Sequence, residues 1–424
     1  MNSLKSLGAF VVGAIVVSIL YGVALGDKDA AVSFEFDDGQ GVRHIVNGDR
    51  GEFVMRDDDL SIEASWRGNY ALNKNGDDIA ELDHRLEITK KENDAAQRAV
   101  FENDGGDIER SYYIDGEKQE WSAQSEDAVR ELLLAFFRAS GVKADERVVA
   151  LSSNGGPDAV LEEMSLLYGD HARQRYVTAL TEYSDLNSGQ RRVLFDMAAD
   201  MDSDHDIRRT LQAIIEHETI TAEDWPQLFD AAQKIESDFD LRRLVESVAE
   251  LELEQQSVQT ALDLIARMES DHDIRRASEA LLEQDAFGGP GAVRLLTVAA
   301  AGLESDHDIR ILLTQTAPFL SAHEDVSEAW LGAFAQLESD HDKRIALEEA
   351  ADINGLTDSA ASKMIAATRD IGSDHEHRLA LSAFSARAER NAELRAVYLS
   401  SAETISSDRA REQALEAIGV DTND

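Results

Sequence analysis

The chain has 424 residues and carries 84 acidic side chains against 41 Lys and Arg, which gives a formal net charge of −43 at pH 7. Proteins bind nucleic acids through clustered Lys and Arg, so a surface this acidic excludes nucleic acid as a partner. The chain has no cysteine, which excludes disulfides, thiolate nucleophiles and cysteine-ligated zinc or iron–sulfur sites.

The apolar segment at the start of the chain predicts a membrane anchor or a signal over residues 1–27. Residues 7–25 carry no charge and nearly reach the ~20 residues that a helix needs to span a bilayer. Lys5 precedes this segment, which places the N-terminus in the cytosol and the bulk of the chain outside it. The alternative is a signal peptide cleaved after Ala24-Leu25-Gly26, which would give a secreted or periplasmic protein. We favour the anchor, because the run exceeds the ~7–15 apolar residues of a usual signal, and expect a single-pass protein of the cell envelope.

Residues 31–122 predict a small antiparallel β domain. Short runs rich in β-branched and aromatic residues alternate with Asn-Gly and Asp-Gly pairs, which supply the positive φ angles that tight hairpins need. None of these turns has the spacing of an EF-hand calcium loop. The predicted strands are 31–37, 42–46, 52–56, 60–66, 86–90, 98–102 and 110–114.

From residue 125 onward a helical pattern replaces the strands, and a short motif recurs. The string Ser-Asp-His-Asp-Ile-Arg begins at Ser203, and related strings follow each other at intervals of 33–35 residues. The eight starts are Gly169, Ser203, Ser237, Ser270, Ser305, Ser339, Ser373 and Ser407. A constant period of this length marks repeated supersecondary units. We predict a mainly α fold, in which residues 125–424 form an α-solenoid of about 34-residue helical hairpins.

Each repeat is predicted to consist of two helices. In the unit that begins at Ser203, the first helix covers residues 204–218 and the second covers residues 222–236. Apolar side chains recur at i, i+4 and i+7 along one face of each helix. Neither helix can bury such a face alone, so each unit must stack on the next.

The motif serine and the acid three residues after it predict a capping box at the start of each first helix. In such a box the hydroxyl accepts from the N3 amide, and the carboxylate accepts from the N-cap amide. The predicted cap residues are Ser203, Asp206, Ser237, Asp240, Ser270, Asp273, Ser305, Asp308, Ser339, Asp342, Ser373 and Glu376. The first and last copies carry Ala172 and Ala410 in place of the acid, as expected of terminal repeats.

The second and sixth motif positions predict an ion pair within each unit. An Asp and an Arg four residues apart share one helix face, and an exposed pair of this kind contributes roughly 0.2–0.5 kcal/mol. We further predict that each Arg bridges to the Asp of a neighbouring unit, which would build a ladder along the stack. The pairs are Asp204 with Arg208, Asp238 with Arg242, Asp271 with Arg275, Asp306 with Arg310, Asp340 with Arg344 and Asp374 with Arg378.

Histidine holds the third motif position in most copies. The six histidines are His171, His205, His272, His307, His341 and His375. Phe239 holds the same position in mid-array, which favours a packing role over metal ligation. Neighbouring units should also lie about 10 Å apart, too far to share one ligand set. A metal- or pH-responsive envelope sensor is the alternative, because imidazoles beside carboxylates bind transition metals and titrate near neutral pH.

The motif resembles that of a group of bacterial envelope proteins. Those proteins carry tandem HEAT-like or TPR-like α-helical repeats with the string Ser-Asp-[Tyr/Phe/His]-[Asp/Glu]-x-Arg, behind a membrane segment and a β-rich region. The resemblance covers residues 1–424 in layout and residues 165–415 in motif. The third position is usually Tyr in that group and mostly His here. The resemblance implies the architecture and no catalytic residue.

The expected function is binding rather than chemistry. The chain has no HExxH, G-x-S-x-G, Walker A or G-x-G-x-x-G motif, so we expect no enzyme, no cofactor and no metal. A membrane-tethered extracytoplasmic scaffold, which presents its α-solenoid surface to a protein or envelope partner, is the favoured hypothesis. A regulatory subunit associated with an enzyme is a further alternative, and the fold alone does not decide between them.

Overall fold

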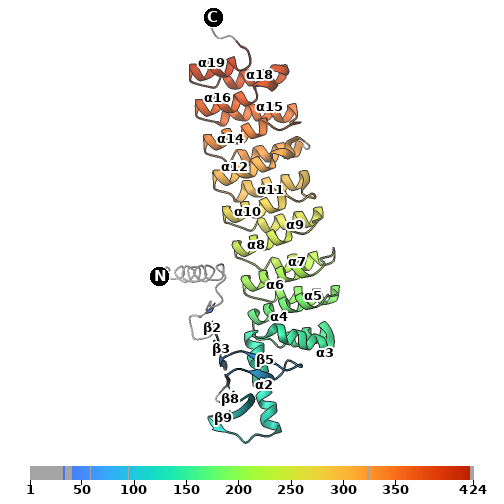
Figure 1. Ribbon diagram of the computed structural model, residues 1–424. Helices are drawn as coiled ribbons and strands as arrows, with labels where there is room; N and C mark the ends of the chain where they lie inside the picture. Colours follow the sequence, from blue (N-terminus) through green and yellow to red (C-terminus); the bar gives the residue numbers. More distant parts are fainter. Residues whose placement is uncertain (1–31, 34–40, 58, 94, 322–323, 421–424) are drawn as a thin grey trace, which may run out of the picture. The chain divides into compact units, whose positions relative to one another are not determined.

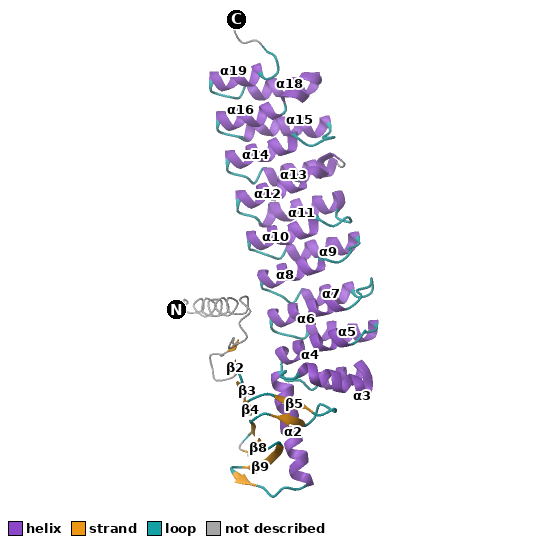
Figure 2. Cartoon of the chain, in the orientation of Figure 1, coloured by secondary structure: helices purple, strands orange, loops and turns teal. Residues whose placement is uncertain are grey.

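The structure, a computed structural model, describes residues 32–33, 41–57, 59–93, 95–321 and 324–420. These residues are mainly helical, with an antiparallel sheet N-terminal to a helical array (Figure 1, Figure 2). The chain divides into two compact units. Unit 1 covers residues 1–194 with 216–218, and unit 2 covers residues 195–215 with 219–424.

The predicted localisation requires correction. Among the described residues, no helix combines the length and the apolar character needed to cross a bilayer. A single-pass membrane protein is therefore not supported. The apolar segment over residues 7–25, on which that prediction depended, lies outside the described residues.

Eight of the described strands of unit 1 form one antiparallel sheet in the order β1-β2-β3-β4-β7-β8-β9-β10. They are β1 (Val32–Ser33), β2 (Gly41–Asn47), β3 (Arg50–Asp57), β4 (Leu60–Arg67), β7 (Arg85–Glu92), β8 (Ala95–Asp104), β9 (Asp107–Ile114) and β10 (Glu117–Lys118). Two-residue turns join β2 to β3 and β8 to β9, and there Gly48 and Gly105 have φ angles of 59° and 70°. These are the tight hairpins that the Asn-Gly and Asp-Gly pairs predict.

A second, two-stranded sheet has no counterpart in the predicted strands. β5 (Tyr70–Leu72) pairs with β6 (Ile79–Leu82), and the register shifts between Ala71 and Leu72. Strands this short contain too few residues for an alternating pattern to be recognised. Their formation depends on packing with residues that are distant in sequence.

The core of unit 1 lies between one face of the large sheet and helix α2 (Ala123–Ser140). Ile62, Leu86 and Ile88 are fully buried, while the residues on either side of each are partly or fully exposed. This alternation is that of a sheet with one buried face. Leu133 and Phe136 of α2 are fully buried against it. The first helix after residue 122 therefore shares the core of the sheet.

The helices that follow α2 lie mostly in pairs. They are α3 (Ala144–Met164), α4 (Asp170–Tyr183), α5 (Ser188–Ala199), α6 (Asp204–His217), α7 (Trp225–Ala232), α8 (Asp238–Val248), α9 (Gln255–Ile265), α10 (Asp271–Leu282), α11 (Gly288–Gly302), α12 (Asp306–Thr316), α13 (Glu324–Phe334), α14 (Asp340–Ala351), α15 (Asp358–Ala367), α16 (Asp374–Ala383), α17 (Ser385–Arg390), α18 (Ala392–Ala402) and α19 (Asp408–Glu416).

In unit 2, each hairpin packs on the next through equivalent helices. The first helices contact each other in the order α8, α10, α12, α14, α16 and α19, and the second helices in the order α7, α9, α11, α13, α15 and α18. Figure 1 shows these two rows following the sequence from α6 to α19. The ninth motif position is fully buried at Leu211, Val245, Leu313 and Leu347. The apolar face of each helical hairpin is thus covered by the neighbouring hairpins.

The second helix of the unit that begins at Ser203 is shorter than predicted. α7 covers Trp225–Ala232 instead of residues 222–236. The Asp224 carboxylate accepts from the Thr221 amide at 2.8 Å and from the Thr221 hydroxyl at 2.7 Å. These bonds hold the residues before α7 in a turn, which delays the start of the helix.

Candidate functional site

The motif serines cap the first helices of consecutive units. Ser305 has an extended backbone, and its Oγ accepts a hydrogen bond from the Asp308 amide at 3.3 Å. The same bond is made at 3.2–3.5 Å by Ser203, Ser237, Ser270, Ser339, Ser373 and Ser407. This half of the predicted capping box gives each helix a partner for one of its free N-terminal amides.

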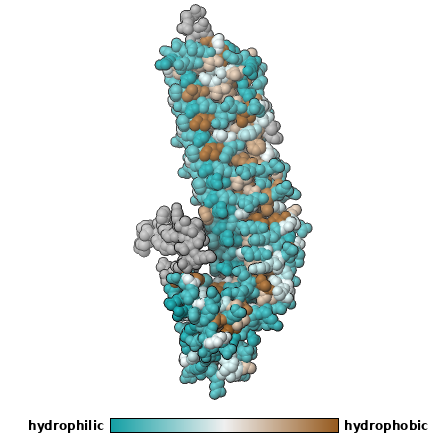
Figure 3. Space-filling view, viewed as in Figure 1, coloured by the Kyte–Doolittle hydropathy of each residue, from teal (hydrophilic) through white to brown (hydrophobic). Residues whose placement is uncertain are grey.

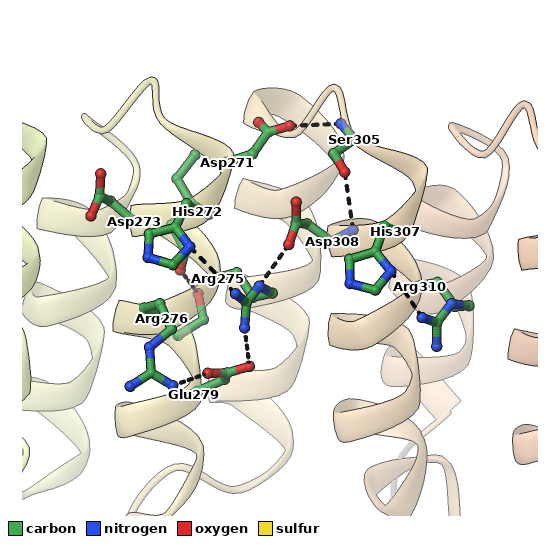
Figure 4. Close-up of polar contacts among 12 residues, drawn as sticks. Asp271, His272, Asp273, Arg275, Arg276, Glu279, Ser305, His307, Asp308 and Arg310 are labelled. Carbon is green, nitrogen blue, oxygen red and sulfur yellow. Dashed lines mark hydrogen bonds and ion pairs between the residues drawn. The ribbon is translucent and has the colours of Figure 1, made fainter.

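The second motif position joins each unit to the next. The Asp271 carboxylate accepts from the Ser305 amide at 2.7 Å (Figure 4). It also accepts from the Glu304 amide at 3.2 Å. We name this arrangement the carboxylate clamp. The equivalent acids hold the cap amide of the following unit at 2.6–2.9 Å, and they are Asp204, Asp238, Asp306, Asp340 and Asp374.

From Ser237 to Ser373 the fourth motif position does not complete the capping box, which corrects the prediction for Asp240, Asp273, Asp308, Asp342 and Glu376. The clamp of the preceding unit already occupies the N-cap amide that the box would use. The fourth-position acid instead meets the arginine of the preceding unit, so Arg275 Nε donates to Asp308 Oδ1 at 2.6 Å. The same contact joins Arg208 to Asp240, Arg242 to Asp273 and Arg310 to Asp342 at 2.5–2.8 Å, and also Arg344 to Glu376. Each contact is a rung of a ladder between units.

The ion pairs predicted within a unit also require correction. Among the described residues, no ion pair joins Asp271 to Arg275, and none joins the equivalent residues of the other units. The second-position acid is engaged by backbone amides across the unit boundary. In three units the arginine contacts the acid four residues after it instead. Arg275 Nη1 donates to Glu279 Oε1 at 2.7 Å, and Arg242 and Arg344 make the same contact with Glu246 and Glu348.

The rungs are largely shielded from water. The side chains of Arg208 and Asp240 are 8% and 11% exposed, which distinguishes this pair from a surface salt bridge. Burial alone would lower the pKa of Arg275, and its bonds to Glu279 and Asp308 raise that pKa above its ordinary value. The arginine charge is thus held in place by acids from two successive units.

The ring at the third motif position contacts the ladder arginine. His272 Nδ1 lies 3.4 Å from Arg275 Nη2, and His307 Nδ1 lies 3.1 Å from Arg310 Nη2 (Figure 4). Arg has no acceptor atom, so Nδ1 accepts and the contact requires a neutral imidazole. The same contact joins His205 to Arg208 at 3.0 Å and His341 to Arg344 at 3.3 Å.

Phenylalanine fills the same role in one unit. The Arg242 guanidinium lies over the Phe239 ring, 5.1 Å from its centroid, in a cation–π contact. Within the described residues, no group of three His, Asp or Glu side chains is placed to hold a metal ion. A guanidinium beside Nδ1 also opposes a metal cation at that atom. The ring therefore orients the arginine, and both imidazole and phenyl can do so.

We expect His272→Phe to leave the thermal unfolding midpoint nearly unchanged, because Phe239 makes the equivalent contact in its own unit. His272→Ala should lower stability by about 0.5 kcal/mol, because the Arg275 guanidinium loses its neighbour. Thermal unfolding followed by circular dichroism measures both changes. A Phe variant less stable than the Ala variant would contradict this role.

The ladder stops where the motif changes. In the last copy Ala410 replaces the acid and Glu412 replaces the arginine, while the first copy has Ala172 and Gln174 at these positions. Arg378 consequently makes no ion pair among the described residues. The clamp continues one unit further, because the Asp374 carboxylate accepts from the Ser407 amide at 2.9 Å.

A buried polar cluster replaces apolar packing at the fifth position of one motif. His377 is 3% exposed, and its Nε2 lies 3.0 Å from Ser401 Oγ and 3.2 Å from Thr368 Oγ1. Burial lowers the pKa of His377, Asp374 opposes this shift and Arg369 adds to it. The cluster therefore favours a neutral histidine in the folded chain.

We expect the pH dependence of stability to report His377. Because its pKa is lowered on folding, its contribution is fully present above the unfolded value of about 6.5 and is lost as the pH falls below it. His377→Ile should therefore lose less stability than the wild type between about pH 7.5 and about pH 5.5, measured by urea unfolding. The pKa of His205 is also lowered, and that of His44 is lowered to about 4. Both histidines are present in the wild type and in the variant, so they do not contribute to the difference between them. Equal losses in both would contradict the prediction.

A buried ion network in unit 1 has no signal in the sequence. Arg147 is 2% exposed and donates to Tyr176 Oη, Gly76 O and Glu163 Oε1, each at 2.5 Å. Glu163 also accepts two bonds from Arg138 at 2.8 and 2.9 Å. The network ties the β5–β6 turn to α2, α3 and α4. Its members are too far apart in sequence for any spacing rule to associate them.

Comparisons with known proteins do not assign a family. No protein-family description matches the chain, and no curated protein matches it. A solved structure described as "Computational Design of Self-Assembling Cyclic Protein Homooligomers" matches with 18% identity, over 69% of this chain and 93% of its own. Its TM-score of 0.13 is too low to support any structural argument. The resemblance to bacterial envelope proteins stays a prediction.

Proposed function

We propose that the helical array is an α-solenoid of about 34-residue hairpins that holds an extended surface for a protein partner. On this proposal the chain is a scaffold or binding protein and not an enzyme. The observation that supports it best is the repeated contact between units. At each boundary from Ser237 to Ser373, the clamp joins a second-position carboxylate to the cap amide, and the rung joins an arginine Nε to a fourth-position carboxylate.

Two directional contacts at each boundary favour a fixed surface over a flexible one. Apolar packing alone permits neighbouring helices to slide and rotate, whereas charge-assisted bonds are short and geometrically specific. A surface already ordered in this way loses little conformational entropy when a partner binds. The clamps and rungs are therefore consistent with a binding platform.

The polar groups of the motif are engaged with each other, which argues against a catalytic role for them. A hollow of about 400 Å³ lies between α9, α11 and α13, and its lining includes Gln259, Arg294 and Asp325. The lining contains a single carboxylate and no histidine, so it lacks a pair of groups for general acid–base chemistry. Binding is the function that this chemistry supports.

Chemical cross-linking in extracts of the source cell tests the proposal. The tagged chain should enrich one protein in near-stoichiometric amount, and an unrelated acidic protein of similar net charge should not enrich it. Hydrogen exchange on the purified complex should then show protection on the outer faces of helices in the array. Enrichment equal to that of the acidic control, or protection confined to the sheet, would contradict the proposal.

A further inference from the structure

The seventh motif position changes its chemistry along the array. It is Arg209, Arg243 and Arg276 in three successive units, and then Ile311, Ile345 and Leu379 in the next three. It lies four residues after the third-position ring, on the same face of the first helix. The three apolar side chains are half-buried, although this face points away from the core. We name Ile311, Ile345 and Leu379 the apolar stripe.

The stripe crosses three adjacent units. Because its members hold one motif position, they recur at equivalent places on α12, α14 and α16, which pack on one another in that order. Figure 3 shows apolar patches, separated by hydrophilic residues, at the levels of these helices as well as elsewhere on the surface. The sequence thus places three apolar contacts in a row, at the spacing of the units.

That spacing matches an α helix laid along the stripe. Packed helices lie about 8–10 Å apart, and one heptad of an α helix rises about 10.5 Å. A partner helix can therefore meet each unit with every seventh residue. An extended strand covers the same distance in about three residues, but residues three apart point to opposite faces of a strand. The spacing favours a helix over a strand.

The negative charge around the stripe favours a partner helix with basic residues on either side of its apolar face. Residues 301–420 contain 22 acidic and 11 basic side chains, a net charge of −11. Glu349 lies four residues after Ile345, is exposed, and makes no ion pair among the described residues. Basic side chains would compensate this charge. A second copy of this chain carries the same negative charge and would be repelled.

We propose that the apolar stripe docks a basic amphipathic helix of a partner protein, with an apolar residue at every seventh position and Lys or Arg at its flanks. This inference depends on the proposed scaffold function and names the surface and the partner chemistry for it. The apolar face of the helix covers the three stripe residues. The flanking cations meet Glu349 and the neighbouring acids.

Arginine, which holds the seventh motif position in three other units, is the replacement that tests the stripe. The variant Ile311→Arg, Ile345→Arg, Leu379→Arg introduces the residue that three other units already carry at this position, so it should fold. The control variant Thr297→Arg, Gln336→Arg, Ser359→Arg adds the same charge at exposed positions outside the stripe. Circular dichroism and the unfolding midpoint should match the wild type for both.

The probe is a synthetic peptide of about three heptads, with Leu at the first and fourth heptad positions and Lys at the flanks. Its control has the same composition in an order that distributes the Leu residues around the helix instead of along one face. Fluorescence anisotropy at physiological salt should show the wild type binding the probe at least tenfold tighter than its control. The stripe variant should lose at least tenfold in affinity for the probe, and the charge control should lose much less.

Three results from the purified proteins would overturn the proposal. They are equal binding of the probe by the stripe variant, equal binding of the reordered peptide, and a wild-type dimer that the stripe variant abolishes. A cellular partner that binds the stripe variant as well as the wild type would also overturn it, but would leave the scaffold function in place. A chain that enriches no partner overturns the scaffold function itself.

Discussion

Asp271→Asn is expected to lower the free energy of unfolding of the array by about 2 kcal/mol. The carboxylate holds the Ser305 amide at 2.7 Å and the Glu304 amide at 3.2 Å, so the change removes the charge from two bonds across a unit boundary. It also directs a side-chain NH2 group toward a backbone N–H, and these two donors cannot bond. Urea unfolding followed by circular dichroism measures the loss.

Asp408→Asn is the matched control for this prediction. Asp408 holds the same motif position, but its side chain is 83% exposed and its ion pair is with Arg411 on its own helix. Exposed pairs of this kind contribute little, so the change should stay within about 0.5 kcal/mol of the wild type. Equal effects of Asp271→Asn and Asp408→Asn would contradict the clamp.

Arg208→Met is expected to cost about 3 kcal/mol, the largest effect of any single rung. Methionine keeps much of the apolar stem, so the loss reports the guanidinium. Without the guanidinium, Asp240, whose side chain is 11% exposed, keeps a buried charge, and Gln212 loses the donor that bonds its Oε1 at 2.5 Å. The same urea titration measures the change.

Arg378→Met is the corresponding control, because Ala410 stands where the next acid would be. We expect its effect to be below about 0.5 kcal/mol. The double variant Arg208→Met, Asp240→Ala should recover part of the loss, since removing both partners leaves no buried charge alone. A double variant whose loss equals the sum of the two single losses would contradict the rung.

Local regularities of the fold follow directly from the sequence. The serines at intervals of 33–35 residues predict helix starts, and each of those from Ser203 to Ser407 caps a helix. Strands β2, β3 and β4 coincide with predicted runs to within a few residues, because their alternation and turn glycines are local features. These signals depend on neighbours in the chain.

The sequence predicts that the motif arginines reach an acid of the neighbouring unit, and those from Arg208 to Arg344 do so. What the local pattern does not reveal is which acid each arginine meets. The local pattern pairs Asp271 with Arg275 and closes a box between Asp308 and Ser305. In the structure the Asp271 carboxylate accepts from the Ser305 amide, so Asp308 does not bond to that amide. The Asp308 carboxylate accepts from Arg275 Nε instead. Both arrangements use the same residues at the same spacing, and only the position of the neighbouring unit decides between them. The Arg147 network could not be predicted from the sequence either, because Arg147 contacts residues as distant in the chain as Gly76.

Hydrogen exchange at the amides of Glu304 and Ser305 tests most directly whether the carboxylate clamps hold the units together. In the wild type these amides should exchange slowly, because their opening requires the boundary to separate. Asp271→Asn should speed their exchange by about 30-fold, the factor that corresponds to ~2 kcal/mol, and leave the amides of Glu338 and Ser339 unchanged. Exchange of Glu304 and Ser305 at the same rate in both proteins would contradict the account.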